Sequence, residues 1–184
     1  WRVFGRRVAP ALRGQIAVTE DSPVKKLEDL HQHEVVFAGP EAFVGYRVPA
    51  AHLIQKGISI NPIFAGNQNA AFSQLLAGRA MAVGSNSALV TGFEEREGKK
   101  LRVLWTSEPY LDLALMSSSK VPPKVVKAVA NAFFKMHQTP VGREVLKNAS
   151  DHVGLDLNSH FLPATDAEYA AYRRFYETAP LSVQ

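Results

Sequence analysis

Residues 34–64 read EVVFAGPEAFVGYRVPAAHLIQKGISINPIF and contain the order of elements that decides the fold. Glu34 to Ala38 is a short apolar run rich in valine, which is typical of a strand buried on both faces. Gly39-Pro40 ends this strand, and the apolar spacing from Val44 to Lys56 predicts a helix. Ile58 to Phe64 follows as the next strand, although Pro62 weakens it. A strand, a helix and a strand in this order form a βαβ unit, which predicts a parallel sheet.

The same alternation continues on both sides of this stretch. The last third of the chain reads as mostly helical, and neither an internal repeat nor a low-complexity tract interrupts the pattern. The sequence therefore predicts an α/β fold with mostly parallel sheets covered by helices. The further expected strands are Gln15–Thr19, Ala80–Val83, Leu101–Trp105 and Leu111–Met116, and the further expected helices are Asn67–Ala77 (with Asn67 or Asn69 as its N-cap), Ser87–Arg96, Val121–His137, Pro140–Asn148 and Asp166–Glu177.

Composition excludes several classes of protein. The 184 residues are 46% hydrophobic and 21% charged, which is typical of a globular protein and not of a coiled coil or a disordered chain. There is no cysteine, so disulfides, thiolate metal sites and a cysteine nucleophile are excluded. No run of about 18 apolar residues predicts a membrane span. The net charge is +4, but the basic residues are scattered in short groups, which does not favour a nucleic-acid interface.

The motifs of common catalytic and metal sites are absent. His31 and His33 are the only close pair of histidines, and alternate residues on a strand point to opposite faces. The run from Gly84 to Ser87 is not a nucleophile elbow, and the run from Gly39 to Gly45 lacks the lysine of a phosphate-binding loop. We therefore expect neither an enzyme nor a metal or organic cofactor.

Four polar or glycine-containing turns follow predicted strands. The ligand crevice of an open parallel sheet lies at the carboxyl ends of its strands, and three of these turns lead into helix N-termini, which favour anions. Turns of this kind also occur without any ligand, so the residues alone leave a binding function and ordinary loop chemistry both open. The four turns are Gly39–Tyr46, Gly66–Asn69, Gly84–Ser87 and Ser107–Asp112.

Three segments together resemble the substrate-binding proteins of phosphate, phosphite and phosphonate ABC transporters. Asp21-Ser22-Pro23-Val24, followed by Leu27-Glu28-Asp29-Leu30, is similar to the family pattern Asp-Ser-Pro-Ile…Leu-x-Asp-Leu. The run from Gly39 to Pro49 follows the frame Asp-Pro-x-Ser-Thr-Ser-Gly-Tyr-x-x-Pro. The run from Phe64 to Ala71 is similar to Phe-x-Gly-Ser-His-Asp-Ala-Ala. The resemblance extends from about Gln15 to Tyr176.

The resemblance implies a type II periplasmic binding protein with two α/β lobes that close on a small-molecule ligand. Residues 1–31 and 106–184 would form the first lobe and residues 32–105 the second. It also implies a periplasmic location and a membrane permease as partner, with no nucleic acid. Only about 20 residues precede the Asp21 turn, so we expect an incomplete first lobe whose exposed sheet edge could support self-association. On that reading, Trp1 marks a fragment boundary.

The departures from the family fall in the pocket. In the family, Ser-Thr-Ser hydroxyls hold the phosphoryl oxygens, and these positions are Ala42, Phe43 and Val44 here. Gln68 replaces the family histidine, and Asp112 lies near where some members place an acid for a ligand amine. We therefore expect a ligand that is neutral or more apolar than phosphate or phosphonate. The ligand-binding candidates are Phe43, Val44, Gly45, Tyr46, Asn67, Gln68, Asn69, Asn86, Ser87, Ser107 and Asp112.

Two readings outside transport remain open. The same fold can serve as a sensing or interaction module of a signalling protein, with a reduced or lost ligand site. It can also form the effector domain of a transcription regulator, although nothing near the N-terminus predicts a helix-turn-helix.

Overall fold

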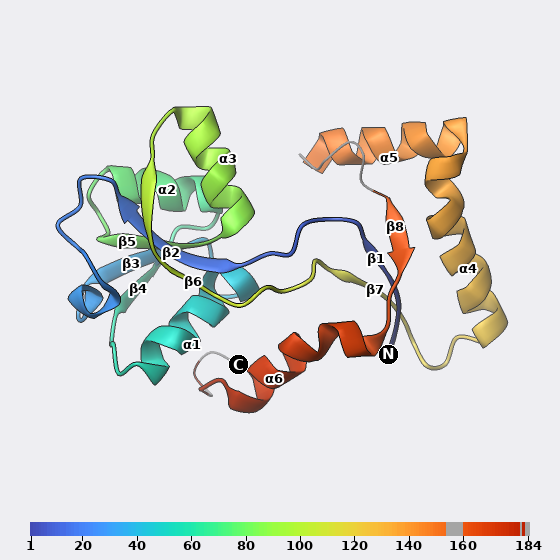
Figure 1. Cartoon of the computed structure of the whole chain (residues 1–184), viewed down its shortest axis with the longest axis horizontal. Helices are drawn as coiled ribbons and strands as arrows, with labels where there is room; N and C mark the ends of the chain where they lie inside the picture. Colours follow the sequence, from blue (N-terminus) through green and yellow to red (C-terminus); the bar gives the residue numbers. More distant parts are fainter. Residues whose placement is uncertain (154–159, 181, 183–184) are drawn as a thin grey trace. The chain divides into compact units, whose positions relative to one another are not determined.

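A computed structural model of the chain describes residues 1–153, 160–180 and 182. The chain divides into two compact units, each formed by two separate stretches of sequence (Figure 1). Unit 1 comprises residues 1–11 and 111–173, and unit 2 comprises residues 12–110 and 174–184. Among the described residues, no helix combines the length and the apolar character that a bilayer crossing requires.

Unit 2 is built on a five-stranded sheet in the order β4-β3-β5-β2-β6. β3 is parallel to both β4 and β5, as expected, whereas β2 is antiparallel to β5 and β6. The chain enters unit 2 at Leu12, and Gly14 pairs with Asn86 at the carboxyl end of β5, so β2 runs in the opposite direction. The sheet is therefore mixed rather than parallel throughout. The strands are β2 (Gly14–Thr19), β3 (Glu34–Phe37), β4 (Asn61–Phe64), β5 (Ala82–Asn86) and β6 (Leu101–Thr106).

Helices cover both faces of this sheet, α2 and α3 on one and α1 on the other (Figure 1). The alternation of side chains along β3 shows why both faces are needed. Val36 packs among residues of α2 and α3, whereas Val35 and Phe37 pack on the side of Leu53 from α1. Val35, Val36 and Phe37 are fully buried and only Glu34 of β3 is exposed, which confirms the prediction of a strand buried on both faces. The helices are α1 (Val48–Gln55), α2 (Gln68–Leu76) and α3 (Ser87–Glu97).

Local signals in the sequence explain where these helices begin. The side chain of Asn67 accepts a hydrogen bond from the backbone N–H of Ala70 at 2.9 Å, which confirms it as the N-cap of α2. Asn86 caps α3 in the same way. The helix expected from Val44 differs, because residues Phe43–Arg47 form a π-helical turn before α1 begins. The predicted strand Ala80–Val83 lies later than expected, at Ala82–Asn86.

Unit 1 contains a three-stranded antiparallel sheet in the order β7-β1-β8. Gly5 is required in β1 because a side chain there would meet the ring of Phe134 from α4 at 2.9 Å. Neither β1 nor β8 was expected, since β1 is rich in arginine and β8 has only three residues. The elements are β1 (Arg2–Arg7), β7 (Ala114–Ser117), β8 (Phe161–Pro163), α4 (Pro123–Lys135) and α5 (Pro140–Val153), which is longer than the predicted Pro140–Asn148.

The last helix, α6 (Ala170–Thr178), follows a 3-10 turn at Asp166–Tyr169. A capping box begins this turn, because the Glu168 carboxylate accepts a hydrogen bond from the Thr165 backbone N–H at 2.7 Å. The first residues of α6 belong to unit 1, and those from Arg174 onward belong to unit 2.

The division of the chain differs from the expected lobes of 1–31 with 106–184 and 32–105. Residues 12–31 belong to unit 2 because β2 lies inside its sheet, between β5 and β6. Residues 174–184 also belong to unit 2. The sequence did not indicate either assignment, since a strand's partners are not encoded next to it.

Candidate functional site

Two candidate residues of unit 2, Gly45 and Gln68, lie beside Gly84, near the carboxyl end of β5. A side chain built at Gly84 would lie 2.2 Å from the Phe37 ring and 2.7 Å from the carbonyl oxygen of Gly45. The Gln68 side-chain amide also donates a hydrogen bond to the Gly84 carbonyl oxygen, at 3.4 Å. Strand β5, the π-helical turn and the start of α2 therefore meet at a glycine that leaves no room for a larger residue.

Phe43 lies in a cluster of aromatic rings. Its ring centre is 4.9 Å from that of Phe175 and 5.2 Å from that of Tyr110, both in edge-on geometry. Tyr176 lies 5.8 Å away, and its hydroxyl accepts a hydrogen bond from Arg47. Such ring pairs are favourable beyond the area that they bury. The surroundings of Phe43 are thus apolar and held in place by the C-terminal half of α6.

A second aromatic group surrounds Tyr46. The Tyr46 ring contacts Phe37 and Phe64 edge-on, with ring centres 4.9 Å apart in both pairs. Phe37 is fully buried, whereas Phe64 on the edge strand β4 remains 42% exposed. Val44 is buried and Gly45 is half-buried, and the turn Phe43–Arg47 contains neither serine nor threonine.

The amide side chains of α2 are engaged within the protein. Asn67 caps the helix through its side-chain oxygen, and Asn69 accepts a hydrogen bond from Arg96 at 3.1 Å. Because Gln68 donates through its nitrogen, its side-chain oxygen remains available as an acceptor. Conversely, capping uses only the oxygen of Asn67, so its NH2 group is left as a donor.

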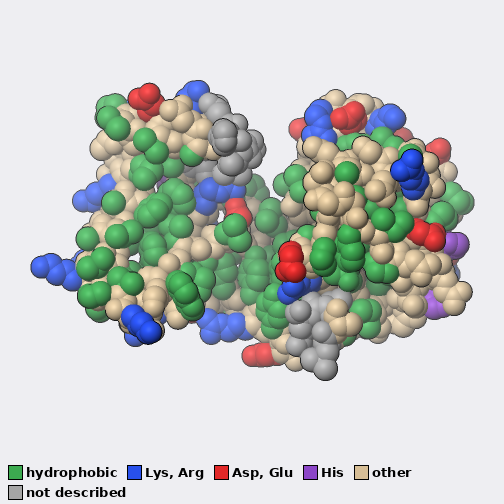
Figure 2. All heavy atoms as spheres, turned by 180° about the vertical axis from the view of Figure 1, so that it is seen from behind, with side chains coloured by type: hydrophobic (Ala, Val, Ile, Leu, Met, Phe, Trp, Pro, Cys, Tyr) green, Lys and Arg blue, Asp and Glu red, His purple; other side chains and the backbone are tan. Residues whose placement is uncertain are grey.

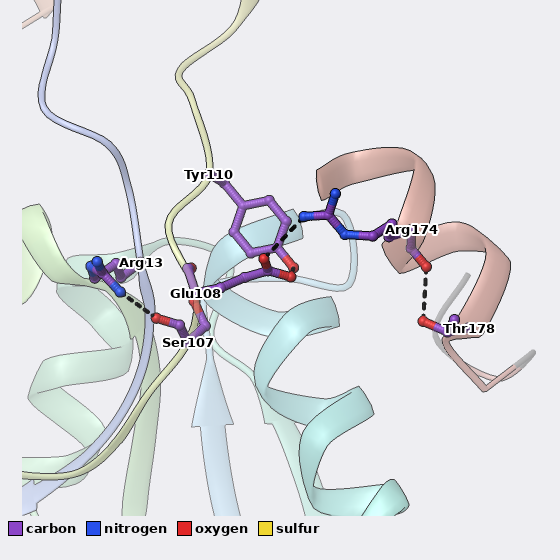
Figure 3. Close-up of polar contacts among 6 residues, drawn as sticks. All are labelled: Arg13, Ser107, Glu108, Tyr110, Arg174 and Thr178. Carbon is purple, nitrogen blue, oxygen red and sulfur yellow. Dashed lines mark hydrogen bonds and ion pairs between the residues drawn. The ribbon is translucent and has the colours of Figure 1, made fainter. Parts of the chain in front are cut away.

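The other polar candidates of unit 2, Ser107, Ser87 and Asn86, form hydrogen bonds within the protein. The Ser107 hydroxyl accepts from the Gly14 N–H at 2.8 Å, and the Ser107 carbonyl oxygen accepts from the Arg13 guanidinium at 2.8 Å (Figure 3). The backbone N–H of Ser87, the first residue of α3, donates a hydrogen bond to the Arg13 carbonyl oxygen at 2.8 Å. Asn86 caps that helix. The side chains of Ser107 and Asn86 thus have structural roles.

Asp112 belongs to unit 1, whereas the other candidates belong to unit 2. Its carboxylate accepts a hydrogen bond from Arg7 at 2.6 Å, and both side chains are about four-fifths buried, being 20% and 18% exposed. Its carbonyl oxygen accepts from the Tyr169 hydroxyl at 2.9 Å. Burial, as the largest cause, raises the pKa of Tyr169, so this hydroxyl stays protonated as a donor.

The sequence did not point to several residues that complete these contacts. Arg13, Glu108 and Arg174 all connect segments that are distant in the chain (Figure 3). No local pattern marks such residues, because their partners lie on other elements. On the face drawn in Figure 2, lysine and arginine side chains are scattered rather than gathered into a stripe. Among the described residues, no group of three or more His, Asp or Glu side chains could hold a metal ion.

The family of periplasmic substrate-binding proteins of phosphonate ABC transporters matches residues 2–169. The chain belongs to this family. Its members are periplasmic substrate-binding proteins. Among curated protein sequences, none matches the chain.

Solved structures agree with this fold at low sequence identity. A binding protein of a Pseudomonas aeruginosa phosphonate transporter has a TM-score of 0.71 at 15% identity, covering 95% of this chain and 61% of that one. PhnD1 from Prochlorococcus marinus, in complex with methylphosphonate, has a TM-score of 0.71 at 13% identity, covering 100% and 72%. The Escherichia coli aliphatic sulphonate binding protein SsuA has a TM-score of 0.61 at 17% identity, covering 96% and 68%. These likenesses show the type II periplasmic-binding-protein fold, and the chain spans 61% of the Pseudomonas protein.

Proposed function

We propose that the protein is the solute-binding component of an ABC-type uptake system whose ligand is neutral or more apolar than phosphate and phosphonate. The observation that carries this proposal is the position of Phe43. Its ring is fixed against Phe175 and Tyr110, where the family has an anion-binding hydroxyl. Each hydroxyl lost from such a site removes a charge-assisted hydrogen bond of about 1.5–3 kcal/mol.

The groups that remain suit a neutral ligand. None of the ten candidate residues of unit 2 carries a formal charge. The NH2 groups of Asn67 and Asn86 are donors, the Gln68 oxygen is an acceptor, and Tyr46 and Phe64 supply apolar surface. Our proposal assigns ligand contacts to these residues together with Phe43, Val44, Gly45, Asn69, Ser87 and Ser107. Asp112, held by Arg7 in unit 1, is the weakest of the candidates.

Calorimetric titration tests the proposal directly. We expect no tight binding of phosphate, methylphosphonate or 2-aminoethylphosphonate, because the hydroxyls that would hold the phosphoryl oxygens are absent. The same titrations on the Phe43→Ser variant control for the loss of the aromatic ring. Binding of any of the three by the unchanged protein with a dissociation constant near 1 μM, about −8 kcal/mol, would refute the proposal.

A sensing or interaction module remains the alternative function. The internal hydrogen bonds of Asn69, Ser87 and Ser107 favour it, since they reduce the number of groups free for a ligand. The two functions differ in their genetic context: a transporter component has permease and ATPase genes beside it, whereas a sensor is fused to an output domain. A permease partner and a periplasmic location are part of the first proposal.

Self-association through a sheet edge is a further part of this proposal. β7 and β8 are the outer strands of the unit 1 sheet, and β7 carries neither a charged residue nor a proline within Ala114–Ser117. Edge strands without such residues pair readily with other strands. Sedimentation analysis of the protein and of a Met116→Lys variant tests this, because a charge on β7 should shift a dimer toward monomer.

A further inference from the structure

A cavity of about 300 Å³ lies within unit 1, between the paired strands β1 and β7 and the beginning of α6. All of its lining residues belong to this unit. Most of them have apolar or aromatic side chains, and the other two are one acid and one base. The lining residues are Val3 on β1, Leu113, Ala114 and Met116 on β7 or just before it, and Asp166, Tyr169, Tyr172 and Arg173 on the 3-10 turn and α6.

The floor of the cavity is one face of the sheet. Val3 lies opposite Met116 in the antiparallel pairing of β1 with β7, so their side chains share a face. Ala114 lies two residues before Met116, and alternate residues of a strand also share a face. Met116 is 48% exposed although it belongs to the sheet. The three side chains thus form a continuous apolar surface that a ligand can reach.

The wall of the cavity consists of two tyrosine rings whose hydroxyl groups bind the backbone. The Tyr169 hydroxyl donates to the Asp112 carbonyl oxygen at 2.9 Å, and the Tyr172 hydroxyl donates to the Leu111 carbonyl oxygen at 2.6 Å. The ring centres lie 5.8 Å apart, with 39° between the planes. Burial raises the pKa of Tyr169, so its ring carries no charge near neutral pH. Both rings are therefore held in place before any ligand binds.

The charged residues at the rim balance each other. The Asp166 carboxylate accepts a hydrogen bond from the Arg173 guanidinium at 3.0 Å. Their side chains are 49% and 59% exposed, so water still reaches both groups. Because the acid and the base are paired, the rim does not select a ligand of either charge.

Three kinds of lining group favour an aromatic ligand over an aliphatic one of the same size. Tyrosine rings pair with a further ring more favourably than the buried area alone would give. The thioether of Met116 is attracted to aromatic rings. The exposed guanidinium of Arg173 can lie over the face of a ring while it keeps its ion pair. The cavity is therefore suited to an uncharged ring with a π face.

We propose that this cavity binds a small uncharged aromatic compound, with its ring between the apolar floor and the two tyrosines. Small-molecule pockets begin at roughly 300 Å³, so the cavity holds one ring or two fused rings and little more. The site goes beyond the transport function proposed above, because none of its lining residues is among the ligand-contact candidates. A bound ring contacts both the β1–β7 pair and the beginning of α6, so its binding stabilises unit 1.

The methyl resonances of methionine make the test direct. Met116 is on the floor, and the chain has only two other methionines, Met81 and Met136, which are outside the lining. In protein labelled with 13C-methyl methionine, we expect indole and phenol at pH 7.5 to shift the Met116 resonance saturably and to leave the other two in place. The dissociation constant of indole should be about 1 mM or lower. Cyclohexanol, similar in size to phenol but not aromatic, should bind at least about fivefold more weakly.

Two variants and a peptide-like probe complete the design. Ala114→Leu fills the floor and should weaken indole binding by about tenfold or more. Ala128→Leu is the matched control, because Ala128 is an exposed residue of α4 outside the cavity, and it should leave the affinity unchanged. N-acetyltryptophanamide should bind more weakly than indole, since the ring alone fills the cavity. Tighter binding of this probe would overturn the assignment to a free compound in favour of a side chain of a protein.

The titration of Met116 and the cyclohexanol comparison use the unchanged protein, so they decide the question even if Ala114→Leu does not fold. No saturation up to about 10 mM indole would overturn the proposal. Equal affinities for cyclohexanol and phenol, equal shifts of all three methionines, or an unchanged affinity in folded Ala114→Leu would each overturn it as well.

Discussion

Replacing Gly84 by alanine is the perturbation that most directly tests the packing around the candidate site. The new methyl group would lie 2.2 and 2.3 Å from two atoms of the Phe37 ring and 2.7 Å from the Gly45 carbonyl oxygen. Neither neighbour can move freely. Phe37 is fully buried and held by Tyr46 and Phe64, and the Gly45 oxygen belongs to the backbone.

The cost follows from these distances. Inserting a methyl group into a well-packed core costs about 1–3 kcal/mol, and occasionally more. The loss of glycine's freedom in the unfolded chain offsets about 0.4–1 kcal/mol. Because both neighbours are fixed, we expect the upper part of this range, a net destabilisation of about 2–3 kcal/mol. For a protein of this size that lowers the melting temperature by about 4–12 °C.

Tryptophan fluorescence during urea unfolding provides the assay, since Trp105 reports on unit 2 once Trp1 is replaced by phenylalanine. Gly92→Ala is the matched control: Gly92 lies inside α3 with no atom within 4 Å of the added methyl group. It should stabilise the protein by about 0.5–1 kcal/mol. Our account of this contact is refuted if Gly84→Ala is as stable as the unchanged protein. It is also refuted if Gly84→Ala destabilises a Phe37→Leu background as much as it destabilises the unchanged protein, since a smaller side chain at position 37 should relieve part of the clash.

Three further predictions concern single side chains. Asp112→Asn should destabilise unit 1 by about 1.5–3 kcal/mol in thermal denaturation, since it breaks the mostly buried pair with Arg7. As a control, Asp166→Asn, in an exposed pair with Arg173, should change the free energy of unfolding by less than about 0.5 kcal/mol. Similar losses in the two variants would contradict this prediction. The pKa of His52 is lowered in the folded protein, so the unfolded chain takes up a proton first and stability should fall as the pH drops below 6.5. Urea unfolding at a series of pH values measures this dependence, and His52→Gln should reduce it. Asn67→Ala should cost about 1 kcal/mol through loss of the α2 cap, while Asn67→Asp retains it, and equal stability of the two variants would argue against capping.

The elements that the sequence predicted well are those with local causes. The strand at Glu34 is a continuous apolar run, the α2 helix begins at an asparagine cap, and the 3-10 turn before α6 begins with a threonine and a glutamate three residues later. Each of these features is determined by residues within a few positions of one another. The family resemblance extended this reading to the fold because its motifs keep their order and spacing.

What could not be predicted depends on partners far apart in the chain. The direction of β2 follows from its pairing with β5 and β6, and no residue within β2 specifies it. In the candidate site, the sequence identified Phe43 as a departure from the family pattern. It could not show that Phe175 and Tyr110 enclose this ring, since neither residue is near Phe43 in sequence. The assignments of ligand contacts therefore remain predictions.

The discontinuous make-up of each unit has a consequence for synthesis on the ribosome. Unit 2 begins at Leu12, yet Phe175, which packs against Phe43, is made long after Phe43 itself. The Phe43 ring of the π-helical turn therefore lacks its Phe175 partner until α6 has been made. β1 waits in the same way for β7 and β8. Exposed apolar surface and unpaired strands promote aggregation, so the nascent chain should depend on chaperones until α6 is complete.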